Sequence, residues 1–587
     1  MNLDPSPISN LSSIHEPKPS LTFTQVLRQA YADCPERVAV HLLQSREEDR
    51  AITYRELLRS AAGYAAALEG AGVAPGDVVI VILQHGIDLL TAFWGAILLG
   101  AVPSIMPFLT EKLAPERYRQ DLAALIETTR PAAIVTYAEF AGEISDAISN
   151  LSSPVPAPRL LISSDVRPAA PDFDRLGGVR RSADDIVLLQ HSSGTTGLQK
   201  GVALSHRAVF NQLACYRQAI RLTQDDVIVS WLPLYHDMGL IASFIMPILS
   251  RVPLVIMSPF DWVRAPYRLF HAVTRYRGTL TWLPNFAYNF CAQKIRERDL
   301  AGVDLSSLRA VINCSEPTYW SSHQAFLDRY RAYGLRAEAL ATSYAMAENV
   351  FAVTQAGIDA PVSVDEVDQR ALLVERVARP VSGGLKLLSA GRPLPNVQVR
   401  VLEDAPNGSA SVGRRDLAER HIGEIALRSD CMLTGYYNRP DLSASTFMDG
   451  WCLTGDLGYL AGGELYVTGR RKDLIIVGGK NVYPQDLERL ASEVPGVHPG
   501  RVVAFGVYNP AAGTEDVVLI AEVDTADRGE RQNIGDAIRQ HVTRSSDVAL
   551  RQVRIVEPRW LLKTSSGKIA RSANRDKYLA ELAAEGH

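Results

Sequence analysis

The most informative run of this chain reads Ser192-Ser193-Gly194-Thr195-Thr196-Gly197-Leu198-Gln199-Lys200-Gly201. It follows an apolar segment, 186–189, whose pattern predicts a buried strand. Glycines allow backbone conformations that a Cβ would block, while the hydroxyls and the lysine can donate hydrogen bonds to a polyphosphate. A Walker loop would place Lys-Ser/Thr directly before a helix, whereas here the first N-cap candidate is Ser205. From composition alone, a phosphate loop and a flexible Ser/Gly turn fit equally well.

The composition describes an ordinary globular protein with more than one domain. The chain has 587 residues, of which 47% are hydrophobic and 21% are charged. A formal net charge of −4 gives no electrostatic reason to expect nucleic acid or an anionic membrane as a partner. The six cysteines have neither close pairs nor metal-ligand spacing, which favours a reduced, cytoplasmic protein. The first twenty residues do not resemble a signal peptide, and we expect no transmembrane segment.

Apolar strands alternating with helical patterns predict an α/β fold. Runs such as 78–83 and 254–257 are short and wholly apolar, as in a parallel sheet covered on both faces. From about Val397 short β-like runs with many glycines predict a smaller antiparallel part. Residues 151–183, which are rich in proline and serine, are predicted to be a surface connection.

Three divisions of the chain follow from these patterns. Residues 1–20 are expected to form a loose N-terminal lead-in. Residues 21–471 are expected to form a large domain with mixed parallel sheets and the small β-rich part. Residues 472–587 are expected to form a small α+β C-terminal domain.

Several polar motifs suit nucleotide chemistry. Tyr344 precedes Glu348 by four residues, so a ring that can stack on a base lies near a carboxylate that can ligate Mg²⁺. Asp456 could accept both ribose hydroxyls, as acidic residues do in other nucleotide sites. Taken singly, these motifs fit a core tyrosine, a solvated glutamate and an aspartate turn at least as well.

Two basic segments follow. The strand-like run ending at Arg470 leads into a charge cluster that includes Lys472, and such clusters are usually solvated. Near the C-terminus, Lys568 lies in the Ser/Gly/Lys segment 563–571, which alone would indicate a surface loop.

Taken together and in this order, the motifs resemble those of the acyl-adenylate-forming superfamily from about Thr22 to Tyr578. This superfamily includes acyl-CoA synthetases, peptide-synthetase adenylation domains and luciferase. Within it, the chain resembles above all the fatty acyl-AMP ligases and related acyl-CoA ligases. The runs that carry this resemblance are Ser230-Trp231-Leu232-Pro233, His236-Asp237-Met238-Gly239-Leu240, Pro284-Asn285-Phe286-Ala287-Tyr288, Lys472-Asp473-Leu474-Ile475-Ile476 and Asn481-Val482-Tyr483-Pro484-Gln485-Asp486.

The resemblance implies two half-reactions. A hydrophobic or fatty carboxylate first attacks the α-phosphate of ATP, which gives acyl-AMP and pyrophosphate. A phosphopantetheine thiol, on CoA or on an acyl carrier protein, then attacks the acyl-AMP. ATP and Mg²⁺ are the implied cofactors, and the small C-terminal domain would rotate between the two steps about Lys472.

The resemblance also implies a role for each matching residue. Lys568 would be catalytic and would bridge the carboxylate and the α-phosphate, while Glu348 would hold Mg²⁺. His236, with Asn285 and Phe286, would border the acyl pocket. The nucleotide would be held by a larger set, which comprises Ser192, Ser193, Gly194, Thr195, Thr196, Gly197, Lys200, Ser315, Glu316, Tyr344, Asp456, Arg470 and Lys472.

Two features depart from ordinary acyl-CoA synthetases. Residues 349–390 form a longer connection, which resembles the insertion of fatty acyl-AMP ligases that is associated with donation to a carrier protein. Ala345 follows Tyr344 where relatives usually have glycine, and its methyl group could reshape acid selectivity or impair adenylation.

Three functions remain open at this stage. The first is a full acid–thiol ligase, and the second is a half-reaction specialist that only forms acyl-AMP or only converts supplied acyl-AMP to a thioester. The third is a non-catalytic nucleotide-binding or regulatory relative. The presence of Glu348, Asp456, Arg470 and Lys568 together argues against the third.

Overall fold

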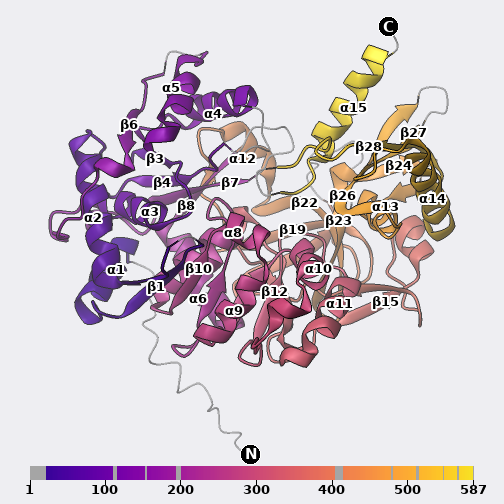
Figure 1. Ribbon diagram of the computed structural model, residues 1–587, viewed down its shortest axis with the longest axis horizontal. Helices are drawn as coiled ribbons and strands as arrows, with labels where there is room; N and C mark the ends of the chain where they lie inside the picture. The colour runs from indigo at the N-terminus through magenta and orange to yellow at the C-terminus, as the bar shows by residue number, and fades with distance from the viewer. Residues whose placement is uncertain are drawn as a thin grey trace, which may run out of the picture.

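A computed structural model describes residues 21–45, 47–109, 115–152, 155–192, 200–403, 414–477, 480–509, 514–546, 548–564 and 567–585. A large body carries the N-terminal and central parts of the chain, and a smaller unit at its upper right carries the C-terminal part, coloured orange to yellow in Figure 1. The lead-in expected over residues 1–20 and the loop residues 193–199 lie outside the described residues.

A seven-stranded sheet forms the centre of the large body, with the strand order β13-β12-β11-β9-β10-β1-β2. Every pairing in it is parallel except that of β2 with β1. The apolar run Leu254–Met257 is buried at all four positions, as expected for a parallel strand covered on both faces. The strands are β1 (Val38–Leu43), β2 (Arg50–Thr53), β9 (Ile228–Ser230), β10 (Leu254–Met257), β11 (Leu280–Leu283), β12 (Ala310–Asn313) and β13 (Leu340–Thr342).

A second, four-stranded parallel sheet has the order β4-β3-β5-β6. Its strands are β3 (Val78–Val81), β4 (Val102–Ile105), β5 (Ala133–Thr136) and β6 (Arg159–Ile162). Strand β6 lies inside residues 151–183, so the prediction that this whole stretch is a surface connection was wrong. Strand β6 is an edge strand whose residues are exposed or half-buried. Its position is set by its pairing with β5, and a local sequence pattern does not reveal such a pairing.

The helices of the large body begin and end at ordinary capping signals. Helix α2 starts after Thr53, which forms a capping box with Glu56, and the buried helix α3 ends at Gly100 in the left-handed conformation (φ 88°). These helices are α1 (Phe23–Asp33), α2 (Tyr54–Gly70), α3 (Ile87–Leu99), α4 (Pro115–Thr129), α5 (Ala141–Ser149), α6 (His206–Ala219), α7 (Met246–Ser250), α8 (Pro259–Arg264), α9 (Tyr267–Tyr276), α10 (Asn285–Lys294), α11 (Trp320–Tyr330) and α12 (Pro440–Thr446).

The β-rich part predicted from about Val397 is confirmed as antiparallel. It comprises β18 (Val397–Leu402), β19 (Gly423–Ser429), β21 (Phe447–Met448), β22 (Trp451–Ala461) and β23 (Glu464–Arg470). A smaller sheet joins β7 (Ile186–Ser192), β8 (Lys200–Ser205) and β20 (Gly435–Tyr436) around the phosphate-loop segment. Short pairs β14 (Thr354–Gln355) with β17 (Arg392–Pro393) and β15 (Val364–Val367) with β16 (Leu385–Leu388) follow the Tyr344 motif.

The C-terminal unit has hydrophobic cores of its own, one of which is centred on buried residues such as Leu487, Leu519 and Ile538. Its elements are β24 (Ile475–Val477), β25 (Lys480–Val482), α13 (Pro484–Ser492), β26 (Val497–Asn509), β27 (Thr514–Val523), α14 (Arg528–Ser546), β28 (Leu550–Val556) and α15 (Arg571–Glu585). Strands and helices mix here as the α+β expectation requires, so the predicted α/β fold class with a small C-terminal part is confirmed. The boundary at Lys472 stays a prediction. Among the described residues, no helix combines the length and apolarity needed to cross a bilayer.

Candidate active site

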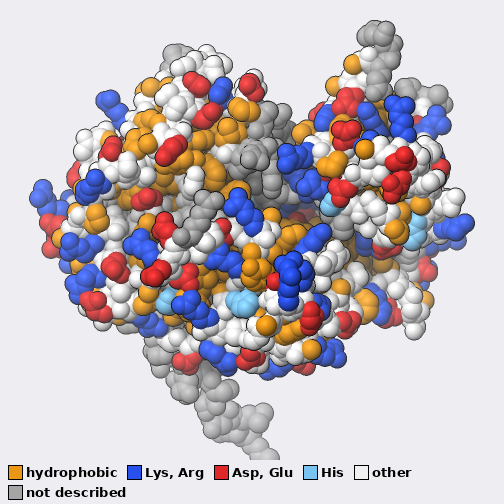
Figure 2. All heavy atoms as spheres, viewed as in Figure 1, with side chains coloured by type: hydrophobic (Ala, Val, Ile, Leu, Met, Phe, Trp, Pro, Cys, Tyr) orange, Lys and Arg blue, Asp and Glu red, His pale blue; other side chains and the backbone are white. Residues whose placement is uncertain are grey.

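Several predicted site residues of the large body follow the carboxyl ends of the central parallel strands. His236 follows β9, Asn285 follows β11, Ser315 follows β12 and Tyr344 follows β13. Ligands of open α/β sheets bind outside the carboxyl ends of the strands, because the loops that connect the layers meet there. In Figure 2 the surface is hollowed between the large body and the C-terminal unit, and charges of both signs are interspersed over this face.

Asp456 is the centre of a pre-arranged carboxylate site. It lies on β22 opposite Arg470 of β23 and is 8% exposed. Its Oδ2 accepts a hydrogen bond of 2.6 Å from the Tyr344 hydroxyl, and its Oδ1 accepts one of 2.9 Å from Arg470 Nε. The nearby carboxylate raises the pKa of the Arg470 guanidinium, so the guanidinium is charged at neutral pH. Three predicted nucleotide residues therefore meet here, and the alternative of a simple aspartate turn was wrong because Asp456 lies within a strand.

A buried carboxylate that sequence reasoning missed supports this site. Glu424, 1% exposed, accepts hydrogen bonds of 2.6 Å from Arg414, 2.8 Å from Arg471 and 3.1 Å from the Gly455 N–H. Because a buried carboxylate needs such partners, the network fixes the backbone immediately before Asp456. The partners of Glu424 are widely separated in sequence, so no local motif predicts this network.

Glu348 and Lys200 meet at Tyr436. The Tyr436 hydroxyl donates a 2.7 Å hydrogen bond to Glu348 Oε1, and Lys200 Nζ lies 5.1 Å from the centroid of the Tyr436 ring. Sequence reasoning missed Tyr436. The described residues contain no cluster of three metal-ligating side chains. A single carboxylate nevertheless fits Mg²⁺, which is commonly bound by one or two carboxylates together with substrate phosphates.

Two non-glycine residues beside the site have positive φ. Ser315 has φ 71°, and the buried Val350 has φ 63° in a turn where the Phe351 N–H donates a 2.7 Å hydrogen bond to the Asn349 carbonyl. A β-branched residue in this conformation is strained, and such strain persists only where the surroundings over-determine it. The strained turn directly follows Glu348 and therefore contributes to its placement.

Ala345 is held by a short antiparallel bridge. It pairs with Ala352, and the Met346 N–H donates a 2.9 Å hydrogen bond to the Phe351 carbonyl. The residue that replaces the usual glycine is therefore accommodated in regular backbone pairing, and its effect on adenylation stays a prediction.

His236 presents an unprotonated ring. Its buried Nε2 has no hydrogen-bond partner among the described residues. Burial lowers the pKa of His236 to about 3, and the positive charge of Lys568 adds to this effect. Burial raises the pKa of the neighbouring Asp237, and the positive charge of Lys568 opposes this rise.

Lys568 of the C-terminal unit faces these carboxyl ends. Its charge acts on His236, Asp237 and Glu316, which all belong to the large body. The predicted catalytic lysine is thus brought to the same region as the predicted acid-binding and nucleotide-binding residues.

An ion-pair cluster anchors the Lys568 segment. Arg571, three residues later, makes contacts of 2.6 Å with Asp473 and 2.8 Å with Glu488 of α13, and its Nε donates to the Ala504 carbonyl at 3.0 Å. All three charged side chains are less than 20% exposed. Because Asp473 directly follows Lys472, Arg571 links the predicted hinge to the Lys568 segment.

Lys472 lies in a short 3₁₀ turn, Arg471–Asp473, directly after β23. Although this residue is exposed in part, desolvation and the nearby Arg470 lower the pKa of its ammonium to about 8. Its position between the two bodies agrees with a hinge, and its movement stays a prediction.

An aromatic cluster adjoins the predicted acid side. Trp231 and Trp262 stack with ring centroids 3.6 Å apart, and Phe286 meets each of them edge-on at 6.2 Å. The Phe286 N–H donates a 3.0 Å hydrogen bond to Glu316 Oε2. Trp231 and Trp262 are buried, so the ring of Phe286, 38% exposed, is the part of this cluster that offers an apolar surface.

The described residues include only the edges of the predicted phosphate loop. Ser193, Gly194, Thr195, Thr196 and Gly197 lie outside the described residues. At its edges, Ser192 pairs with Lys200 across β7 and β8. Ser205 caps α6 by accepting a hydrogen bond from the Ala208 N–H, as predicted.

Comparison with known proteins agrees with this geometry. A family model described as AMP-binding enzyme matches residues 27–437. The chain belongs to the AMP-binding enzyme family. It is 30% identical over 545 residues to a long-chain-fatty-acid–AMP ligase of Mycobacterium bovis, which covers 86% of this chain and 88% of that protein. It is 28% identical over 565 residues to a medium-chain-fatty-acid–acyl-carrier-protein ligase of Moorena producens, which covers 92% of each.

Solved structures show the same fold. A structure from a study of fatty acyl-adenylate ligases from E. coli and L. pneumophila superposes with a TM-score of 0.85 and 27% identity, and the match covers 96% of this chain and 98% of that one. This member of the AMP-binding enzyme family is therefore an ATP-dependent, adenylate-forming acyl ligase. The resemblance of its motifs to fatty acyl-AMP ligases is confirmed.

Proposed function

We propose that this chain is an acid–thiol ligase that activates a hydrophobic or fatty carboxylic acid as its acyl-AMP and transfers the acyl group to a phosphopantetheine thiol. The observation that carries the proposal is the position of Lys568, whose charge acts on His236, Asp237 and Glu316. A lysine here can stabilise the charge of the attacking carboxylate and of the α-phosphate together.

In the adenylation step, the carboxylate oxygen forms a bond to the α-phosphorus of ATP and pyrophosphate leaves. Asp456 would accept the ribose hydroxyls, and Tyr344 would lie against the base while its hydroxyl keeps Asp456 oriented. Bound Mg²⁺, held by Glu348, would neutralise phosphate charge. Holding the two reactants in one site replaces a bimolecular encounter by a local one.

The acid would lie against Phe286, whose ring is supported by the buried Trp231 and Trp262, and close to His236. An apolar wall favours a hydrocarbon or aromatic acid over a small polar one. Because the ring of His236 is neutral, it adds no second positive charge that would compete with Lys568 for the carboxylate.

The acceptor thiol is proposed to belong to an acyl carrier protein. One relative is a ligase to an acyl carrier protein, and the longer segment 349–390 resembles the insertion associated with such acceptors. CoA is the alternative acceptor of the same thiol chemistry.

A half-reaction specialist that stops at acyl-AMP is the second candidate, and one contact favours it. Tyr483 of the C-terminal unit, 3% exposed, packs in one hydrophobic cluster with Val367 and Leu372 of the segment 349–390. A C-terminal unit held in this way would rotate less readily for the thiol step.

Pyrophosphate exchange with a panel of aromatic, medium-chain and long-chain acids tests adenylation. Supplying the synthetic acyl-AMP of the preferred acid with CoA, or with a phosphopantetheinylated carrier protein, tests the second step. Exchange with thioester formation supports the ligase, and exchange alone supports the specialist. Consumption of supplied acyl-AMP without pyrophosphate exchange would identify a thioester-forming specialist and would point to Ala345 as the cause of the lost adenylation. The absence of both activities would contradict both proposals.

A further inference from the structure

A short segment around β20 joins the turn that carries Glu348 to the strand that follows the phosphate loop. The Leu433 N–H donates a 2.8 Å hydrogen bond to the Glu348 carbonyl, and the Tyr437 N–H donates one of 2.7 Å to the Gly201 carbonyl. Between these two bonds, β20 pairs antiparallel with β8, which begins at Lys200. The segment is therefore fixed both to the predicted Mg²⁺ ligand and to the strand of the predicted phosphate-binding lysine.

Tyr436, on β20, contacts both of these charged residues with different parts of its side chain. Its hydroxyl donates a 2.7 Å hydrogen bond to Glu348 Oε1, and the ammonium nitrogen of Lys200 lies 5.1 Å from the centroid of its ring. The side chain is held firmly, since Tyr436 is buried and belongs to the main hydrophobic core of the large body. A phenol suits both contacts, because its hydroxyl is a donor and its ring face attracts a cation.

The two charged groups stay available for a ligand. Within the described residues, Glu348 Oε2 accepts no hydrogen bond, and Glu348 and Lys200 form no ion pair with each other. Opposite charges that share one small site attract each other, and a direct pair would neutralise the metal ligand and the phosphate-binding cation together. Because the carboxylate is held at the hydroxyl and the ammonium is held over the ring, Tyr436 keeps the two groups at separate positions.

We propose that Tyr436 is a positioning residue for adenylation, which orients Glu348 for Mg²⁺ and keeps Lys200 from pairing with it. This inference rests on the proposed function, in which Glu348 holds the metal and Lys200 contacts the phosphates. With Oε1 occupied by the Tyr436 hydroxyl, Oε2 is the oxygen left for the metal. Loss of a hydrogen-bond partner from a metal-binding carboxylate typically lowers metal affinity by about 10–100-fold, because the ligand is no longer held in one orientation.

The hydroxyl is tested by Tyr436→Phe, which keeps the ring beneath Lys200. Isothermal titration without any acid substrate would give the Kd of ATP in excess Mg²⁺ and in EDTA. The ratio of the EDTA value to the Mg²⁺ value measures the contribution of the metal without turnover. We expect this ratio to fall about tenfold in Tyr436→Phe, while the Kd in EDTA stays as in wild type. In Glu348→Gln the ratio should fall to about one, because the metal ligand itself is lost.

Tyr437→Phe is the matched control on the same segment. The side chain of Tyr437 packs against a different hydrophobic cluster, which includes Val102 and Leu189. Its hydroxyl has no hydrogen-bond partner within the described part of the chain. The ratio of the two Kd values should therefore equal that of wild type. Thermal unfolding would verify that each variant is folded.

The ring is tested by Tyr436→Leu, which removes both contacts. Lys200 should then pair with Glu348, so ATP should bind about tenfold more weakly even in EDTA, where Tyr436→Phe has no effect. Combining Tyr436→Leu with Glu348→Gln should restore the affinity in EDTA, because Lys200 loses the carboxylate that competes with the phosphates. This gain should exceed the gain that Glu348→Gln gives in the wild-type background, since the two substitutions act on one contact.

The possible failures are distinguishable. A normal ratio in Tyr436→Phe together with a lost ratio in Glu348→Gln would overturn the proposal and leave the proposed function standing. A ratio of about one in wild type would contradict Glu348 as the metal ligand, and with it both this inference and that part of the proposed function. Equal losses in Tyr436→Phe and Tyr437→Phe would show a general effect of the segment and would also overturn the proposal. Unchanged ATP affinity of folded Tyr436→Leu in EDTA would refute the separation from Lys200.

Discussion

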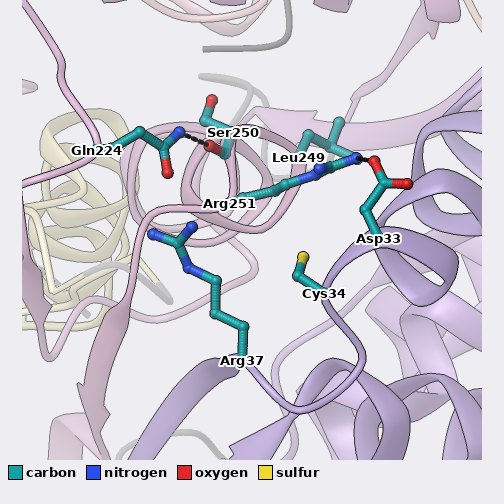
Figure 3. A pocket seen from close by; sticks show the side chains of 7 residues that line it. All are labelled: Asp33, Cys34, Arg37, Gln224, Leu249, Ser250 and Arg251. Carbon is teal, nitrogen blue, oxygen red and sulfur yellow. Dashed lines mark hydrogen bonds and ion pairs between the residues drawn. The ribbon is translucent and has the colours of Figure 1, made fainter. Parts of the chain in front are cut away.

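At the carboxyl end of the seven-stranded sheet, polar side chains from distant segments are bonded to one another before any ligand arrives. Asp456 already holds Tyr344 and Arg470, and Glu348 already holds Tyr436. At the amino end of the same sheet, Asp33 of α1 and Arg251, which follows α7, form an ion pair of 3.0 Å (Figure 3). The difference indicates that the carboxyl end is pre-arranged for chemistry, where small displacements are costly, while the ion pair at the amino end joins two neighbouring elements of the fold.

The largest effect should come from removing the charge that the C-terminal unit brings to the carboxyl end. Lys568→Ala should slow acyl-AMP formation by about 10²-fold or more, the scale found when one pre-organised donor is lost. Thioester formation from supplied acyl-AMP should persist, because the thiol attacks after the lysine has moved away. Pyrophosphate exchange and a thioester assay on the same preparation measure the two steps, and equal loss of both would contradict a two-conformation mechanism.

A second prediction concerns Asp456, which is central to the pre-arranged side of the comparison. Asp456→Asn should weaken the binding of ATP and acyl-AMP together, because both ligands present the same ribose. The loss of charge-assisted hydrogen bonds should cost roughly 1.5–3 kcal/mol. Isothermal titration of both ligands measures it, with Asp449→Asn in the exposed turn before β22 as the matched control. Unchanged affinity for both ligands would show that Asp456 does not bind the ribose.

Much of the fold could be predicted because its signals are local. Four-residue apolar runs identified the parallel strands, and Ser205 was recognised as an N-cap from its place before a helical pattern. Edge strand β6 was missed because pairing with β5, rather than burial, positions it. Its short run carries no alternation that would distinguish it from a connection.

The site could be predicted only where a residue belongs to a motif. Tyr344 and Glu348 were found together, but Tyr436, the partner of Glu348, lies 88 residues away and has no motif of its own. The buried Glu424 network and the strained Val350 were missed for the same reason, since burial and backbone angle depend on tertiary packing.

A third prediction tests whether pre-arrangement extends into the C-terminal unit. Arg571→Gln removes the cation between Asp473 and Glu488, so the Lys568 segment should lose its fixed position. We expect adenylation to fall about tenfold, less than the roughly 10²-fold cost of a full 1 Å misplacement. The thioester step from supplied acyl-AMP should change little.

The control for Arg571 lies on the same helix. Arg575→Gln alters an arginine that is 46% exposed and 3.8 Å from Asp576, so it should leave adenylation unchanged. Arg571→Lys should recover part of the activity, because an ammonium keeps the charge but not the forked geometry. If Arg571→Gln and Arg575→Gln behave alike, or if both half-reactions fall together with loss of folding, the cluster does not position Lys568.

The smallest expected effect is a pH dependence that should be absent. Burial lowers the pKa of His236 to about 3, so the ring gives up its proton near that pH and is neutral from about pH 5 to pH 8. His236→Asn should therefore lower kcat/KM by removing a surface of the acid site, yet leave the shape of the pH profile unchanged over this range. The measurement is pyrophosphate exchange from pH 5 to pH 8 in wild type and variant, with the exposed His271→Asn as control. An acidic limb with an apparent pKa near 6.5 that disappears only in His236→Asn would mean that the ring titrates as if solvated. In that case water reaches the His236 ring, which this structure buries. The contrast between the carboxyl and amino ends of the seven-stranded sheet would then be weaker than the contacts indicate.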